Sequence, residues 1–137
     1  MAKYAKGANA ERELIRMLFG KGFAVARVAG SGVSPFPCPD IVALKQGKVL
    51  GIECKAWDSA YLSIPIAQVS DLQKWADTAG AEVYIGWKQP RKGWFFLLPS
   101  HFKKTNKFFI ISQKKAVLDG LSINVLVGEQ TLLSPKK

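Results

Sequence analysis

The sequence predicts an α/β fold in which a mixed central β-sheet is flanked by helices, within a single domain of residues 1–137. Two observations lead to this prediction. Segments with apolar residues at helical spacing alternate with short apolar runs bounded by glycine, proline or polar turns. Their order is helix, strands, helix, strands, which is typical of a mixed sheet with helices on its faces. A chain of 137 residues that is 48% hydrophobic supports one core.

The first predicted elements are a helix and a short strand. The helix spans residues 8–21, with Gly22 at the position of a C-terminal cap, and the strand spans residues 23–28. The segment GSGVSPFPCP at residues 30–39 is rich in glycine and proline and predicts a loop. The apolar stripe that indicates the helix consists of Ala10, Leu14, Met17 and Leu18.

A β-hairpin and a second helix follow. The apolar runs DIVAL at 40–44 and VLGIECK at 49–55 are joined by the polar turn KQGK, which is a hairpin pattern. The second helix is predicted over 65–79, with Ser63 as its N-cap and Gly80 closing it. Its buried stripe is predicted to be Ile66, Val69, Leu72, Ala76 and Ala79.

The remaining strands lie in the second half of the chain. Residues 82–87 and 94–98 are predicted to form two strands joined by the basic turn KQPRKG, and residues 108–112 form another. The segment SINVLVGEQTLL, within residues 121–133, fits both a strand of period two and a helix. We favour the helix, whose apolar positions would be Ile123, Leu126, Val127 and Leu133.

Composition indicates a nucleic-acid partner and an intracellular location. Twenty Lys and Arg against ten Asp and Glu give a net charge of +10, which attracts polyanions. The N-terminal segment is polar and basic, so no signal peptide is expected and Cys38 and Cys54 are expected to be free thiols. No apolar run approaches the length of a membrane span, and one histidine without a CxxC pair argues against structural zinc.

The most informative pattern is Pro39-Asp40, twelve intervening residues, and Glu53-Cys54-Lys55. Positions two apart on a strand share a face, so Glu53 and Lys55 point the same way while Cys54 points into the core. The hairpin brings the Asp40 carboxylate beside Glu53. Two carboxylates so close repel each other unless a cation lies between them, and oxygen ligands suit Mg²⁺ or Mn²⁺. A lysine beside them suits phosphoryl chemistry.

A third carboxylate, Glu11, lies in line with the apolar stripe of the first helix. An acid in that position requires a partner, because its burial without one is costly. The alternative is a first-turn glutamate that is favoured by the helix dipole, and Glu13 is interpreted in that way. Glu11 is better explained by orientation toward a metal site.

Four segments together resemble the archaeal Holliday junction resolvases, which belong to the PD-(D/E)xK nuclease superfamily. The segments are KGANAEREL at 6–14, GFAVARVAGSG at 22–32, PDIVALK at 39–45 and IECK at 52–55. The resemblance covers nearly the first 60 residues with little change in spacing, and the later elements are also similar. It implies a restriction-endonuclease-like fold and a magnesium-dependent, structure-selective endonuclease that resolves four-way junctions in DNA recombination and repair.

The resemblance also implies roles for individual residues. Glu11, Asp40 and Glu53 would be metal-associated carboxylates, joined by the backbone carbonyl of Cys54, whose thiol then has a structural role. Lys55 would be the catalytic lysine, and Ser31 an active-site residue near the scissile phosphate. Mg²⁺ is the expected cofactor, and Mn²⁺ is expected to substitute for it.

Basic residues and a glycine-containing loop indicate where DNA would bind. Arg12 and Arg16 lie one helical turn apart and share a face, and contacts of this kind grip phosphates without reading bases. The predicted DNA-binding residues are Lys3, Lys6, Arg12, Arg16, Arg27, Gly30 and Gly32. Two opposed nicks require two active sites, which predicts a two-fold homodimer, with Trp75 as the expected interface aromatic and core packing as its alternative role.

Three functional hypotheses follow from these features. The first is a Holliday junction resolvase that makes paired symmetric nicks. The second is a related nuclease that acts on other branched or mismatched DNA. The third is a basic protein that binds nucleic acid without catalysis, which the complete set Glu11, Asp40, Glu53 and Lys55 argues against. The third would bind DNA or RNA, and the two nuclease hypotheses imply a protein associated with DNA inside the cell.

Overall fold

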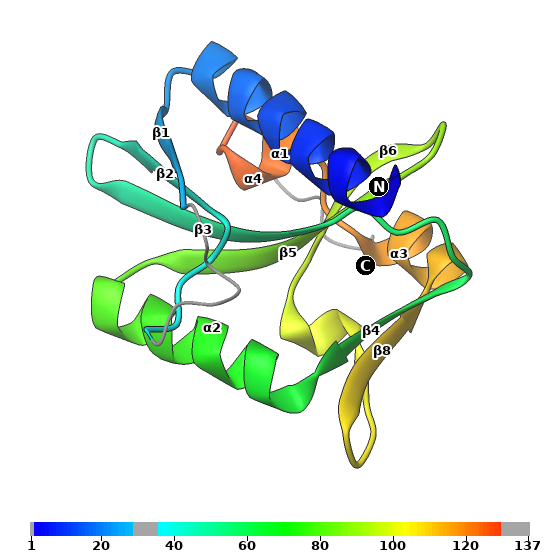
Figure 1. Ribbon diagram of the computed structural model, residues 1–137. Coiled ribbons are helices and arrows are strands. Elements are labelled where there is room, and N and C mark those ends of the chain that lie inside the picture. The colour runs from blue at the N-terminus through cyan, green and yellow to red at the C-terminus, as the bar shows by residue number, and fades with distance from the viewer. Residues whose placement is uncertain (1, 29–35, 130–137) are drawn as a thin grey trace, which may run out of the picture.

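A five-stranded mixed sheet lies at the centre of the computed structural model, which describes residues 2–28 and 36–129 (Figure 1). The strand order in this sheet is β1-β2-β3-β5-β6, and a second sheet has the order β4-β8-β7. The predicted α/β class and mixed sheet are confirmed. The elements are α1 (Ala2–Gly20), β1 (Ala24–Arg27), β2 (Ile41–Lys45), β3 (Lys48–Lys55), β4 (Tyr61–Pro65), α2 (Ile66–Ala79), β5 (Glu82–Gln89), β6 (Gly93–Leu97), the 3₁₀ helix η2 (Pro99–His101), β7 (Lys103–Lys104), β8 (Phe108–Ser112), α3 (Gln113–Asp119) and α4 (Ile123–Leu126).

The predicted hairpin is formed by β2 and β3. Gln46 and Gly47 in its turn both have positive φ, 47° and 86°, which matches the right-handed twist of paired strands. The register pairs Ile41 with Ile52. Continued by one residue, this register puts Asp40 opposite Glu53, and opposite residues of an antiparallel pair project to the same face.

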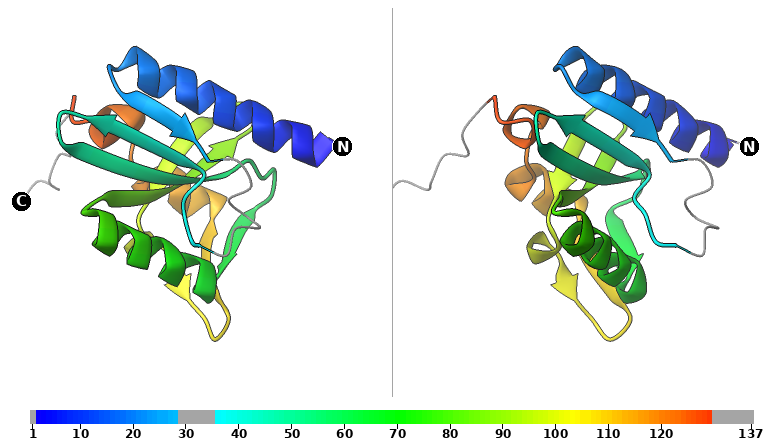
Figure 2. Two further views of the ribbon diagram at one scale, coloured as in Figure 1. Left: turned by 60° about the vertical axis from the view of Figure 1, so that its left-hand side comes forward. Right: turned by 90° about the vertical axis from the view of Figure 1, so that its left-hand side faces the viewer.

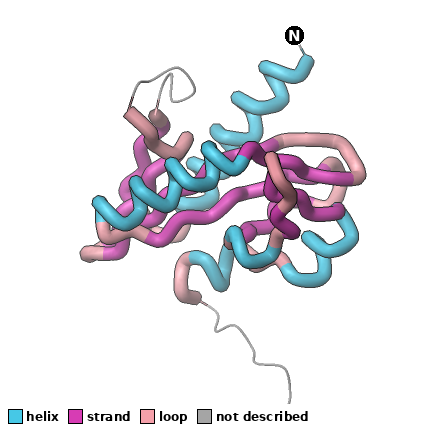
Figure 3. The backbone as a smooth tube through the Cα atoms, turned by 90° about the horizontal axis from the view of Figure 1, so that it is seen from below, coloured by secondary structure: helices cyan, strands magenta, loops and turns pink. Residues whose placement is uncertain are grey.

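The sheet is mixed because one of its strand pairs is parallel. β3 pairs with β5 in parallel, and the chain between them passes through β4 and α2, which together form the crossover that parallel strands require. Figure 2 shows α1 and α2 on opposite sides of the sheet, and in Figure 3 α2 runs across the strands when the molecule is seen from below. This crossover carries α2 back over the end of β3 where Glu53 and Lys55 lie.

Two hydrophobic clusters fill the two faces of the main sheet. On one face, Leu14 and Leu18 of α1 pack against Ile41 and Ile52 of the hairpin, together with residues of α4. On the other face, α2, α3 and the small sheet enclose a second cluster, whose largest member is the fully buried Trp87. Burial of apolar side chains on both faces fixes which way each strand residue points.

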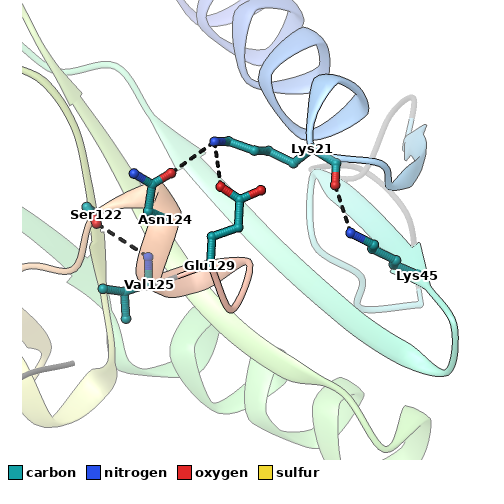
Figure 4. Close-up of polar contacts among 6 residues, drawn as sticks. All are labelled: Lys21, Lys45, Ser122, Asn124, Val125 and Glu129. Carbon is teal, nitrogen blue, oxygen red and sulfur yellow. Dashed lines mark hydrogen bonds and ion pairs between the residues drawn. The ribbon is translucent and has the colours of Figure 1, made fainter. Parts of the chain in front are cut away.

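The last helix and the first are tied together at the C-terminal end of α1. Lys21 Nζ donates hydrogen bonds to Asn124 Oδ1 at 3.0 Å and to Glu129 Oε1 at 2.8 Å (Figure 4). Lys45 Nζ in turn donates to the backbone oxygen of Lys21 at 3.0 Å. These contacts hold α4 beneath α1, which closes the first hydrophobic cluster.

Several predicted boundaries were wrong. α1 begins at residue 2 instead of residue 8, so neither Glu11 nor Glu13 lies in its first turn. Ser63 does not cap α2, because it belongs to β4, and the residue before the helix is Pro65. Ala79 is exposed at the end of α2 instead of contributing to its buried stripe.

The C-terminal third is more regular than predicted. The predicted helix within 121–133 is confirmed as the short helix α4, although residues 130–133 lie outside the described part of the chain. β4, β7 and α3 were not predicted from the sequence. These elements form or flank the second sheet, whose strands come from separate parts of the chain.

Among the residues that the structure describes, no helix is long and apolar enough to cross a membrane.

Candidate active site

Glu53 lies at the centre of a group of charged side chains where the β2–β3 hairpin meets α2. It is buried, with 8% of its surface exposed, and Lys55 Nζ lies 3.8 Å from its Oε2. The shared orientation of Glu53 and Lys55 follows from their spacing on β3. Burial, together with the negative charges of Asp40 and Glu11, raises the pKa of Glu53 to about 7, while Lys55 opposes the shift.

Asp40 is anchored by the backbone of β3. Its Oδ2 accepts a hydrogen bond of 2.9 Å from the backbone N–H of Cys54. The carboxylate is therefore held at the open end of the hairpin, close enough to Glu53 to raise the pKa of that group. Two acids on one face of a hairpin, one of them buried, form a concentrated site of negative charge in a chain whose net charge is +10.

Glu11 approaches the same place from α1. Its Oε1 accepts a hydrogen bond of 2.6 Å from Arg27 Nε on β1, and its side chain is 19% exposed. Glu11 also raises the pKa values of Glu53 and Cys54, so its charge acts on the hairpin site. Arg27 is therefore a partner of the kind that an acid on this face of α1 requires.

The carboxylates suit a hard divalent cation, although they are not gathered around one point. In residues 2–28 and 36–129, no three acids, cysteines or histidines lie close enough together to hold a metal ion. Asp40 and Glu53 nevertheless repel each other across the hairpin, and a cation between them would relieve that repulsion. The donor chemistry fits Mg²⁺ or Mn²⁺, with Glu11 as a third ligand only if it moves away from Arg27.

Cys54 contributes its backbone to the site and its side chain to the core. Its N–H binds Asp40, whereas its side chain packs against the cluster beneath α1. Burial raises the pKa of the Cys54 thiol well above its usual range, which keeps the thiol protonated. Cys38 and Cys54 are both free cysteines, as predicted.

The buried charge of Glu53 makes metal-free stability depend on pH. Its pKa rises from 4.5 to about 7 on folding, so stability is highest when the group is protonated in both states and falls as pH rises from about 4.5 to 7. In the presence of a chelator, we expect the free energy of unfolding to fall by on the order of 3 kcal/mol between pH 4.5 and 8 from this group. Urea denaturation of wild type and Glu53→Gln at both pH values measures the difference, and an equal loss in both proteins would contradict it.

Known proteins identify the family. A family model described as archaeal Holliday junction resolvase (Hjc) matches residues 2–133. The chain belongs to this family. A crossover junction endodeoxyribonuclease Hjc from Archaeoglobus fulgidus is 42% identical over 125 residues, which is 91% of each chain. The corresponding protein from Methanocaldococcus jannaschii is 33% identical over 113 residues, or 82% of this chain and 80% of that protein.

A solved structure supports the same relationship. The crystal structure of Archaeoglobus fulgidus Hjc, described as a Holliday junction resolvase, superposes with a TM-score of 0.80 and 38% sequence identity. The match covers 90% of this chain and 96% of that chain. The resemblance to this family and the restriction-endonuclease-like fold, both expected from the sequence, are therefore confirmed. The relatives of the Hjc family named here are nucleases, which are enzymes that hydrolyse phosphodiester bonds.

The residues predicted to bind DNA come from α1, from β1 and from the stretch after β1 that the structure does not describe. Arg12 and Arg16 are exposed on α1, and Arg12 Nη1 donates a hydrogen bond of 2.9 Å to Asn9 Oδ1. Arg27 is exposed on β1 while it holds Glu11. Of the other predicted residues of this Hjc-family chain, Lys3 and Lys6 lie in α1 with side chains outside the described part, and Gly30, Ser31 and Gly32 lie outside the described residues altogether.

Trp75, the predicted interface residue, packs within its own chain. Its ring lies over Gly51 of β3, where an added Cβ would be 2.6 Å from Trp75 Cζ3 and 3.0 Å from Pro39 Cγ. The side chain is half-buried, so part of it faces outward from α2. Trp75 and Pro39, the residue before Asp40, therefore both lie against Gly51. In this Hjc-family chain, Trp75 therefore has a packing role whether or not it also contacts a second copy.

The contacts of Gln68 and of Glu13 were not expected from the sequence. Gln68 of α2 reaches Glu53, with Nε2 and Oε2 3.5 Å apart. Glu13, interpreted as a helix-dipole residue, instead accepts hydrogen bonds from Lys88 at 2.8 Å and from the Trp94 indole at 2.9 Å. These contacts lower the pKa of Glu13. All three pairs join residues far apart in sequence, and no local pattern indicates them.

Proposed function

We propose that this chain is a Holliday junction resolvase: a magnesium-dependent endonuclease that makes paired symmetric nicks in four-way DNA junctions as a homodimer. The observation that carries this proposal is the buried Glu53, set beside Asp40 and 3.8 Å from Lys55, in a chain of the Hjc family. The relatives' names, crossover junction endodeoxyribonuclease, supply the substrate class.

The acidic residues and Lys55 would have different roles in the reaction. Asp40 and Glu53 would hold Mg²⁺, or Mn²⁺ in its place, with Glu11 and the backbone carbonyl of Cys54 completing the ligands. When bound, the metal supplies a Lewis acid that activates water and neutralises charge on the phosphate. Lys55 orients the attacking water and stabilises the negative charge that develops on the phosphate oxygens. Ser31 is proposed to contact the scissile phosphate.

The basic residues around the site are proposed to grip the DNA backbone. These residues are Lys3, Lys6, Arg12, Arg16 and Arg27, and Gly30 and Gly32 would let the backbone of their loop approach a phosphate closely. A net charge of +10 adds a long-range attraction between the protein and DNA. Such contacts position the junction and carry no sequence preference.

Loss of one of these phosphate contacts has a measurable signature. We expect Arg12→Ala to weaken junction binding uniformly across sequences and to reduce the slope of log K against log salt by roughly 1. Fluorescence anisotropy over a series of salt concentrations measures this slope. The matched control is Lys48→Ala, because Lys48 begins β3 at the end opposite to Lys55 and already pairs with Glu82 at 3.8 Å. An equal change in both variants would contradict the assignment of Arg12.

A homodimer is proposed because two opposed nicks need two active sites. The outward part of Trp75 on α2 is the proposed interface contact. Light scattering on the intact protein should give twice the 15.0 kDa mass of one chain. A monomer at assay concentrations would remove the basis for symmetric nicking.

The decisive experiment compares substrates. A labelled four-way junction and a duplex of matched sequence are incubated with the protein, with and without Mg²⁺. We expect symmetric cutting of the junction only when Mg²⁺ is present. Equal cutting of both substrates would reject junction selectivity while keeping nuclease activity, which is the second hypothesis. Binding without cutting at any divalent metal concentration would favour a non-catalytic DNA-binding protein.

A further inference from the structure

Gln68 lies against the buried acid of the active site. It is in the first turn of α2, which packs on the sheet face that carries Glu53, as the position of the Trp75 ring over Gly51 indicates. Gln68 is half-buried, and the neighbouring Val69 is fully enclosed in the second hydrophobic cluster. The amide is therefore fixed between a packed helix and a charged site.

Two donors approach the same oxygen of Glu53. Gln68 Nε2 lies 3.5 Å from Oε2, and Lys55 Nζ lies 3.8 Å from that same atom. Both distances are long, so these contacts orient the carboxylate more than they bind it tightly. Among the described residues, none donates a hydrogen bond to the other oxygen, Oε1. The oxygen that remains available to a cation is therefore Oε1.

The other end of the Gln68 amide makes no such contact. Its Oε1 is buried and accepts no hydrogen bond from the described part of the chain. Reversing the amide would bring this oxygen against the Glu53 carboxylate, which is repulsive. A buried acceptor without a donor destabilises a fold, and methionine would fill similar space without that penalty. The amide of Gln68 thus makes the fold less stable than methionine would, as expected of a residue that is retained for a functional site.

We propose that Gln68 is a positioning residue for the metal-binding carboxylate. Together with Lys55, it contacts Oε2 of Glu53 and thereby leaves Oε1 for the cation. This inference rests on the proposed function, since it takes Glu53 to be a metal ligand. Groups that orient a metal ligand by hydrogen bonding commonly contribute a factor of roughly 10 to 100 to metal affinity or activity.

The test uses three variants and two measurements. Binding of Mn²⁺ is followed by electron paramagnetic resonance, and the melting temperature is measured without metal. Gln68→Met should raise the Mn²⁺ dissociation constant roughly 10- to 100-fold and raise the metal-free melting temperature by roughly 2 to 5 °C. Gln68→Asn, whose amide is one methylene too short, should lose affinity without that gain in stability. Gln73→Met, an exposed position on the same helix, should change neither quantity.

The outcomes separate this inference from the proposed function. Wild-type Mn²⁺ affinity in either Gln68 variant would overturn the positioning role, and so would a lower melting temperature in Gln68→Met, which identifies a structural amide. Junction nicking is measured on the same preparations. A wild type that binds Mn²⁺ without cutting junctions would reject the proposed function and leave the role of Gln68 supported. A wild type that binds no Mn²⁺ would reject both.

Discussion

Replacing Glu53 by glutamine is expected to lower the rate of junction nicking by roughly three orders of magnitude. Glutamine keeps the size of the side chain but removes the charge that attracts a divalent cation, and loss of that ligand removes several kcal/mol of transition-state stabilisation. Because Glu53 is 8% exposed and its pKa is raised to about 7, the same substitution also removes an unfavourable buried charge. The variant should therefore be inactive and, without metal at pH 8, more stable than wild type.

Rates and affinities must be measured together. Single-turnover nicking of a labelled junction gives the rate, and a gel shift in Ca²⁺ gives binding, which should stay within roughly threefold of wild type because phosphate contacts come from basic residues. Asp40→Asn should behave in the same way. Asp71→Asn, an exposed acid on α2, is the matched control and should cut normally. Normal cutting by both Glu53→Gln and Asp40→Asn would show that the chemistry takes place elsewhere.

Adding one methyl group at Gly51 is expected to destabilise the fold and disturb the site at once. The new Cβ would lie 2.6 Å from Trp75 Cζ3 and 3.0 Å from Pro39 Cγ, distances that atoms do not tolerate without movement. Overpacking of this kind costs about 1–3 kcal/mol. A shift of Pro39 moves Asp40, so nicking should fall together with stability.

Thermal unfolding and nicking of Gly51→Ala measure both effects. The control is Gly20→Ala, because a Cβ at the end of α1 meets nothing within 4 Å and alanine favours the helix. In a Trp75→Leu background the cost of Gly51→Ala should shrink, since the ring that causes most of the overlap is gone. Full additivity of the two substitutions would exclude the proposed clash.

Local sequence patterns predicted the part of the candidate site that lies on the β2–β3 hairpin. Asp40 and Glu53 are brought together by a two-residue turn, so strand alternation and turn chemistry are sufficient to place them on one face. The cap at Gly22 and the stripe of α1 were likewise predictable because each depends on neighbours in sequence. The start of α1 was placed too late because the apolar stripe that indicates the helix begins only at Ala10.

Tertiary contacts account for what the sequence did not reveal. The bond between Arg27 and Glu11 joins β1 to α1, and the contact between Gln68 and Glu53 depends on how α2 crosses the sheet. β4 was missed because its residues lead directly into α2, and Pro65 can end a strand as readily as precede a helix. Such pairings have no periodic signal, because the partners meet only after the crossover is complete.

The two-residue turn between β2 and β3 imposes a parity rule on the site. In an antiparallel hairpin with a fixed turn, the strands can lengthen only by one residue each, so the number of residues between Asp40 and Glu53 can change only in twos. A single insertion in either strand would turn one acid to the opposite face and separate the pair. We therefore expect this chain to keep its activity far better after insertion of an even number of residues in the hairpin than after insertion of an odd number.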